Sequence, residues 1–153
     1  MSRAFSLIVL ASFLALGCTS PRAQTRMTPP PEELAVQLHD AIWRDILSNA
    51  WIGNGNELAA RWANARREGE EAPSLYIQNL LCVGDVARLR CRFGLFREGG
   101  VANYLGRPAP ERLACAANFL RFEDEEGEGW RIPRLPPRRG GHSRITIACR
   151  PAP

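Results

Sequence analysis

The chain has 153 residues, of which 45% are hydrophobic and 24% charged, a size that fits one domain after any leader is removed. Its net charge is +4, but sixteen acidic residues are interleaved with twenty arginines, so the net charge alone carries little weight. None of the five cysteines forms a C-x-x-C pair, which argues against a zinc site.

The first seventeen residues predict an export signal. Arg3 supplies one positive charge, an apolar run extends from Ala4 to Leu16, and Gly17-Cys18 follows. The run is too short to cross a membrane, which takes about 20 apolar residues. We therefore assign residues 1–17 to a signal peptide.

The segment Leu14 to Cys18 resembles the lipobox of bacterial lipoproteins. Leu14 stands one place further from the cysteine than the usual leucine, with Ala15 in its position. The resemblance implies that Cys18 is lipidated and becomes the mature N-terminus. Thr19 rather than Asp follows it, which by resemblance to enterobacterial sorting implies the outer membrane, facing the periplasm. The alternative is ordinary cleavage, after Gly17 or Ala23, to a soluble exported protein.

Residues 18–30 are polar and rich in proline, which predicts a disordered tether. From Pro31 the pattern becomes helical, with acidic residues in the first turn. The apolar stripe contains Leu34, Leu38, Ile42 and Ile46, widened by Trp43 and Leu47. Residues 51–56 predict a turn, and Asn56 is placed to cap a second helix that passes through Trp62 and ends near Gly69.

Leu75 to Arg97 carries two strand patterns. In the second strand, Leu89, Cys91, Phe93 and Leu95 alternate with Arg88, Arg90 and Arg92, which predicts one buried and one solvated face. In the first, Tyr76, Leu80 and Cys82 share a face, with Leu75, Ile77, Leu81 and Val83 opposite. Both faces contain apolar residues, which indicates a more central strand covered on both sides.

Two registers fit this hairpin. A tight turn on Gly84-Asp85 would set Cys82 against Ala87, whereas a looser loop sets Cys82 opposite Cys91 and Leu80 opposite Phe93. We favour the looser register because it lets these two cysteines bond. In an exported protein the four remaining cysteines predict disulfides, and we expect Cys82–Cys91 and Cys115–Cys149.

The rest of the chain predicts a long loop, two further strands in a second hairpin, and a last strand. Residues 97–112 form the loop, with a short piece of structure at residues 101–105, and Leu113 to Phe122 forms the third strand. Residues 123–129 form an acidic turn into Trp130, which lacks the ligand spacing of a calcium loop. Residues 143–150 alternate Ile145, Ile147 and Cys149 as the last strand.

Together these elements predict one α+β domain, residues 31–150. Two N-terminal helices pack on one face of a sheet with four or five antiparallel strands, and disulfides staple the sheet. The order is compatible with a cone of the NTF2-like or cystatin-like sort, by fold analogy alone. The two-cysteine hairpin followed by Gly129-Trp130 resembles small uncharacterised exported proteins of proteobacteria, a resemblance that implies no activity.

The sequence contains no recognisable catalytic or cofactor-binding constellation. His39 and His142 have no Ser, Cys or Asp partner at a recurring spacing, so we expect no catalytic residue, no cofactor and no metal. A small ligand held between Trp43, Trp51, Trp62 and Trp130 is the alternative to an interaction or structural protein of the envelope.

Arginine forms two denser patches. One is Arg88, Arg90 and Arg92, and the other is Arg131, Arg134, Arg138, Arg139 and Arg144. They could contact anionic lipid or an acidic envelope protein, in addition to the membrane contact of the N-terminal lipid. Nucleic acid is not an expected partner outside the cytoplasm.

Overall fold

The computed structural model describes residues 26–52, 57–124, 127–135, 144–145 and 147–153. Two helices come before all the strands, and the main sheet is antiparallel, so the predicted α+β class is confirmed. The first helix begins only at Glu32, which places both helices before the sheet but not at the N-terminus of the chain.

Helix α1 spans Glu32–Ile52. The Ala35 amide donates to the Pro31 carbonyl at 2.8 Å and closes the first turn. Leu38, Ile42 and Ile46 are buried as the spacing predicts, but Leu47 is 54% exposed. At about 100° per residue, Leu47 lies on the opposite side of the helix from Leu38, so its assignment to the apolar stripe was wrong.

Helix α2 spans Glu57–Asn64 and ends well before Gly69. The cause lies in Arg66, whose amide and carbonyl bond to Asn103 at 3.0 Å each. Those backbone groups are therefore not available to continue a helix. Residues 51 and 52 belong to α1 and not to the predicted turn, because the helix continues to Ile52; residues 53–56, with the predicted cap, lie outside the described part.

The main sheet has five strands. Its path is β1-β2-β5-β6, and β9 pairs with β5 on the side that β6 also uses. The strands are β1 (Leu75–Gly84), β2 (Arg88–Arg97), β5 (Arg112–Asp124), β6 (Gly127–Arg131) and β9 (Ala148–Pro151). Strand β5 is longer than predicted, and it joins every other strand of the sheet except β1.

Strand β1 is an edge strand, so the prediction of a central strand covered on both sides was wrong. Its pairing with β2 shifts between Gln78 and Leu81, and Asn79 has a φ of 53°. Such a bulge reverses the inward and outward alternation. Tyr76 is consequently exposed on the opposite side from Leu80 and Cys82, and the predicted shared face is wrong.

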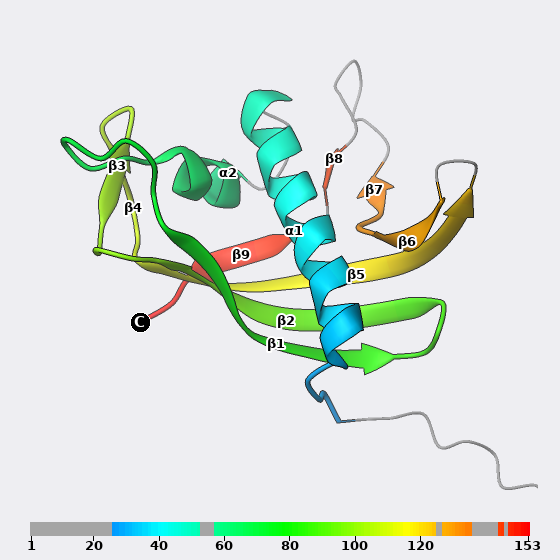
Figure 1. Ribbon diagram of the computed structural model, residues 1–153. Helices are drawn as coiled ribbons and strands as arrows, with labels where there is room; N and C mark the ends of the chain where they lie inside the picture. The colour runs from blue at the N-terminus through cyan, green and yellow to red at the C-terminus, as the bar shows by residue number, and fades with distance from the viewer. Residues whose placement is uncertain (1–25, 53–56, 125–126, 136–143, 146) are drawn as a thin grey trace, which may run out of the picture.

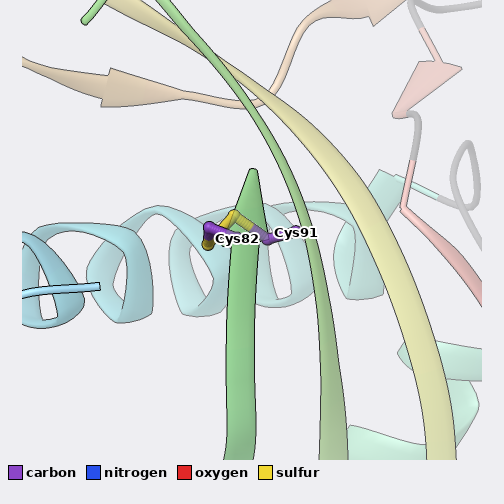
Figure 2. Close-up of a disulfide and its surroundings, with 2 residues drawn as sticks. All are labelled: Cys82 and Cys91. Carbon is purple, nitrogen blue, oxygen red and sulfur yellow. A yellow bond between two sulfur atoms is a disulfide. The ribbon is translucent and has the colours of Figure 1, made fainter. Parts of the chain in front are cut away.

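Beyond the bulge the looser register is confirmed, with Cys82 opposite Cys91. The two cysteines form a disulfide between neighbouring strands, shown in Figure 2. A second disulfide joins Cys115 of β5 to Cys149 of β9. Each pair has its Cα atoms 4.1 Å apart, close to the separation of directly opposite residues in a non-hydrogen-bonded pair. Both predicted bonds are present.

Two short hairpins complete the described chain. Strands β3 (Ala102–Tyr104) and β4 (Arg107–Ala109) pair within the predicted long loop, and β7 (Arg134–Leu135) pairs with β8 (Arg144–Ile145). The predicted last strand is therefore divided between β8 and β9. Strand β9, which carries Cys149, begins only at Ala148.

Both helices lie on one face of the sheet, as Figure 1 shows. The hydrophobic core lies between the helices and the sheet. It contains Leu38 and Ile42 from α1, Trp62 from α2, and Phe93 and Phe119 from the sheet. In the part of the chain that the structure describes, no helix has both the length and the apolar character needed to cross a membrane. Neither of the two described helices covers the other face of the sheet.

Candidate functional site

The candidate site is the sheet face turned away from the helices, here called the outer face, which carries exposed arginine and aromatic side chains. Opposed residues of neighbouring strands share a face, so the register identifies its members. One row runs Gln78, Gly94, Ala114, Arg150, and the next runs Leu81, Arg92, Ala116, Ala148. Four strands thus contribute side chains to one surface.

Six arginines from four strands belong to the outer face: Arg88, Arg90, Arg92, Arg112, Arg131 and Arg150. Arg90, Arg92 and Arg150 are exposed and form no ion pair with the residues that the structure describes. Guanidinium groups present several donors in a planar fork that fits phosphate and carboxylate oxygens. The face therefore offers unpaired donors to an anion.

A groove of about 710 Å³ runs over the middle of the outer face. The groove exists because Gly94, Ala114 and Ala116 bring almost no side-chain volume above the sheet backbone. Arg92 of β2 and Arg150 of β9 line the groove from opposite sides of β5. The small residues thus let an anionic group approach the sheet between two guanidinium groups.

Aromatic side chains stand at both ends of this surface. Tyr76 stacks on Phe96 with ring centres 6.1 Å apart, and the Arg112 guanidinium lies 5.1 Å from the Phe96 ring. At the other end Arg131 lies 5.6 Å from the Phe122 ring. These contacts hold Arg112 and Arg131 against the sheet through cation–π attraction.

Acidic residues lie at the border of the outer face. Glu98 accepts a hydrogen bond from the Tyr76 hydroxyl at 3.1 Å, and Glu111 pairs with Arg112 at 3.4 Å. Asp85 accepts from the amides of Ala87 and Arg88 in the hairpin turn, and these bonds lower the pKa of its carboxyl group. The centre of the face, around Arg90 and Arg92, remains cationic.

The sequence pattern identified only part of this surface. Arg88, Arg90 and Arg92 were predicted to share a solvated face, and they do. Of the second predicted patch, Arg131 joins the same face, whereas Arg138 and Arg139 lie outside the described residues, as do the side chains of Arg134 and Arg144. Arg112 and Arg150 were missed, since only the pairing of β5 with β2 and β9 brings them there.

The three tryptophans whose side chains the structure describes lie in different surroundings. Trp62 is fully buried in the core, and Trp43 packs against that core half-buried. Trp130 lines a separate cavity of about 500 Å³ between α1 and β6, together with Asp45, Arg131 and Ile132. The side chain of Trp51 lies outside the described part.

The guanidinium groups of the outer face are suited to binding an anion through ion pairs and hydrogen bonds. His39 is half-buried on α1, and His142 lies outside the described residues. Among the residues that the structure places, no three His, Cys, Asp or Glu side chains come together as a metal site.

Comparison of the chain with protein-family models, with curated proteins and with solved structures gives no match.

Proposed function

We propose that the protein is a non-enzymatic lipoprotein of the cell envelope, held by a lipid on Cys18 at the outer membrane and facing the periplasm. The lipobox-like residues Leu14 to Cys18 support the anchor. The two disulfides support an oxidising compartment, because cytosolic proteins seldom keep such bonds. In this proposal residues 18–30 connect the anchor to the folded domain.

The role that we propose for the domain is binding of an anionic envelope component through the outer face. The observation that carries it is the set of exposed arginines, Arg90, Arg92 and Arg150, that no described acidic residue neutralises. Both helices pack on the opposite face, so a partner reaches these arginines without displacing the core.

Cross-linking in cells tests the proposal. The double variant Arg90→Glu/Arg92→Glu should lose most of the cross-linked partner, because two attractive charges on the outer face become repulsive. Arg44→Glu/Arg107→Glu is the matched control, with the same charge change at exposed positions outside that face. Equal cross-linking by both variants would contradict the proposal, and so would substrate turnover by a protein that recovers no partner.

The anchor is tested separately with Cys18→Ala. This variant should lose metabolic labelling with fatty acid and should remain unprocessed or become soluble, because the sulfur that accepts the lipid is absent. Cys91 is unsuitable as a control because it is disulfide-bonded, so Thr19→Ala serves instead. Membrane association that is unchanged in Cys18→Ala would count against the lipobox.

A second candidate function is binding of a small ligand, as in an NTF2-like or cystatin-like cone. The cavity beside Trp130 favours it, because about 500 Å³ lies within the usual range of ligand pockets. Ala41 is buried and lines this cavity, so Ala41→Leu should reduce binding of an apolar fluorescent probe. Identical probe binding by the variant and the parent protein would rule this candidate out.

A further inference from the structure

The chain segment before α1 is fastened to the edge of the sheet. The Thr28 amide donates to the Cys82 carbonyl at 2.9 Å, and the Cys82 amide donates to the Thr28 carbonyl at 2.8 Å. Cys82 is in turn covalently joined to Cys91 of β2. The point at which the N-terminal segment meets the domain is therefore fixed beside β1, as Figure 1 shows for the blue segment below α1.

This attachment limits how far the domain can stand from an anchor on Cys18. Thr28 lies ten positions after Cys18, with nine residues between them. Fully extended, this stretch spans at most about 33–36 Å. A lipid on Cys18 would thus keep the β1 edge of the sheet within about 36 Å of the membrane surface.

The outer-face arginines lie next to the same attachment point. Arg90 and Arg92 flank Cys91, which pairs with Cys82, which pairs with Thr28. Strands lie about 4.8 Å apart, so about 10 Å separates Thr28 from the Cys91 backbone. The tether and the centre of the cationic face are therefore neighbours.

Two exposed apolar side chains lie in and beside the hairpin that joins β1 to β2. Val86 is 78% exposed at the hairpin tip, and Leu81 is 36% exposed on the outer face beside Arg92. Apolar side chains bordered by arginine are typical of surfaces that enter the head-group region of a bilayer. This combination favours a lipid surface over an acidic protein.

We propose that the outer face lies against the membrane that holds the anchor, with Arg88, Arg90, Arg92 and Arg150 on the phosphates of anionic head groups. The inference rests on the proposed lipoprotein function and adds the identity of the anionic partner. Cationic groups next to an anionic leaflet are attracted only within about one Debye length, roughly 8 Å at physiological salt. The short tether lets the arginine face come within range of that attraction.

Arginine footprinting of the lipid-anchored protein tests this orientation. The protein, isolated from the envelope in detergent, is reconstituted into vesicles of phosphatidylcholine alone or mixed with phosphatidylglycerol, treated with phenylglyoxal and mapped by mass spectrometry. Arg90, Arg92 and Arg150 should react at least about threefold more slowly in the anionic vesicles. Arg44 and Arg107, exposed outside this face, should react equally in both.

Salt and charge reversal provide the controls. In about 1 M salt, where the Debye length is about 3 Å, the protection should disappear. Protection of Arg150 should also be lost in Arg90→Glu/Arg92→Glu but kept in Arg44→Glu/Arg107→Glu. Protection that survives both changes would overturn the ionic docking.

Flotation of the vesicles distinguishes a failure of the outer face to dock on the membrane from a failure of the lipid anchor. Equal reaction rates in both vesicles, with the protein still floating, would overturn membrane docking and leave the anchored lipoprotein standing. A protein that does not float with neutral vesicles would overturn the anchor and the docking together. Protection in whole envelopes but not in pure lipid would identify an acidic protein as the partner and overturn the lipid assignment.

Discussion

The guanidinium carbon of Arg97 lies 5.3 Å from the centre of the Trp62 ring, and Arg97 also donates a hydrogen bond to the Trp62 main-chain carbonyl. Arg97 ends the inward-facing series of β2, and its side chain is fully buried. Glu70 lies 3.9 Å from its Nη1 atom. Burial lowers the pKa of Arg97, and the Glu70 carboxylate opposes that shift.

Arg97→Ala should destabilise the domain by about 2–4 kcal/mol, because it removes the cation–π contact and leaves the buried Trp62 carbonyl without its donor. Urea unfolding measures the change. Arg107→Ala, at an exposed position, is the control and should alter the free energy of unfolding little. A loss no larger than that of Arg107→Ala would show that the buried arginine contributes nothing to stability.

Acid should weaken the domain partly through Glu70. The Arg67 amide and guanidinium donate to this carboxylate, and these bonds lower its pKa below the ordinary 4.5. The ionised Glu70 carboxylate therefore stabilises the fold fully when the pH is above the ordinary pKa of 4.5. That stabilisation is lost as the pH falls through the lower pKa of the folded state. Glu70→Gln should therefore narrow the stability difference between neutral and acidic pH.

Asp85 acts in the same direction but at lower pH, since backbone amides lower its pKa below the ordinary 3.8. The double variant Glu70→Gln/Asp85→Asn should therefore show a still smaller loss of stability in acid, measured by urea unfolding at a series of pH values. Parallel curves for the parent and both variants would show that these carboxylates do not cause the acid sensitivity.

Local alternation was enough to predict the two faces of β2, because each residue of an unbroken strand reverses direction. Arg90 and Cys91 accordingly lie on opposite sides, and the cysteine spacing favoured the correct register. The pattern failed at β1 because the bulge at Asn79 reverses the alternation and nothing in its residue types announces it. A single inserted residue thus moved Tyr76 to the outer face.

The candidate site depends on pairings between strands that are distant in the sequence. Arg150 lies opposite Ala114, and Gly94 lies opposite the same alanine on its other side. Neither neighbour can be read from local periodicity, since the order of strands in a sheet is a property of the whole chain. The arginines of β2 were therefore predicted, whereas the groove and its remaining arginines were not.

Two glycines of this hairpin should respond in opposite ways to alanine. At Gly84, which has a φ of 149°, an added Cβ would overlap the Arg88 carbonyl oxygen, so Gly84→Ala should cost about 1–3 kcal/mol. At Gly94 the nearest atom to an added Cβ would be the Gln78 carbonyl oxygen at 3.6 Å, an ordinary contact. Gly94→Ala should therefore stabilise the strand by about 0.5–1 kcal/mol.

Chemical denaturation of the two alanine variants decides this prediction. The opposite signs are the informative result, because both changes add the same methyl group to neighbouring parts of one sheet. A loss of stability in Gly94→Ala as large as that in Gly84→Ala would contradict the contacts assigned to these two glycines.

The two disulfides should contribute different amounts to the free energy of unfolding. Cys82–Cys91 closes a sequence separation of 9 residues and Cys115–Cys149 one of 34, for which loop entropy predicts about 2.7 and about 3.8 kcal/mol. Cys115→Ala/Cys149→Ala should thus destabilise the domain more than Cys82→Ala/Cys91→Ala, as measured by urea unfolding. The longer bond also fastens β9, with Arg150, to β5, so its removal should weaken anion binding at the outer face. Cys82 is held by Thr28 and by the β2 ladder as well, so the shorter bond should be the less costly to lose. The reverse order of stabilities would show that native contacts, rather than the size of the closed loop, decide the contribution of each disulfide.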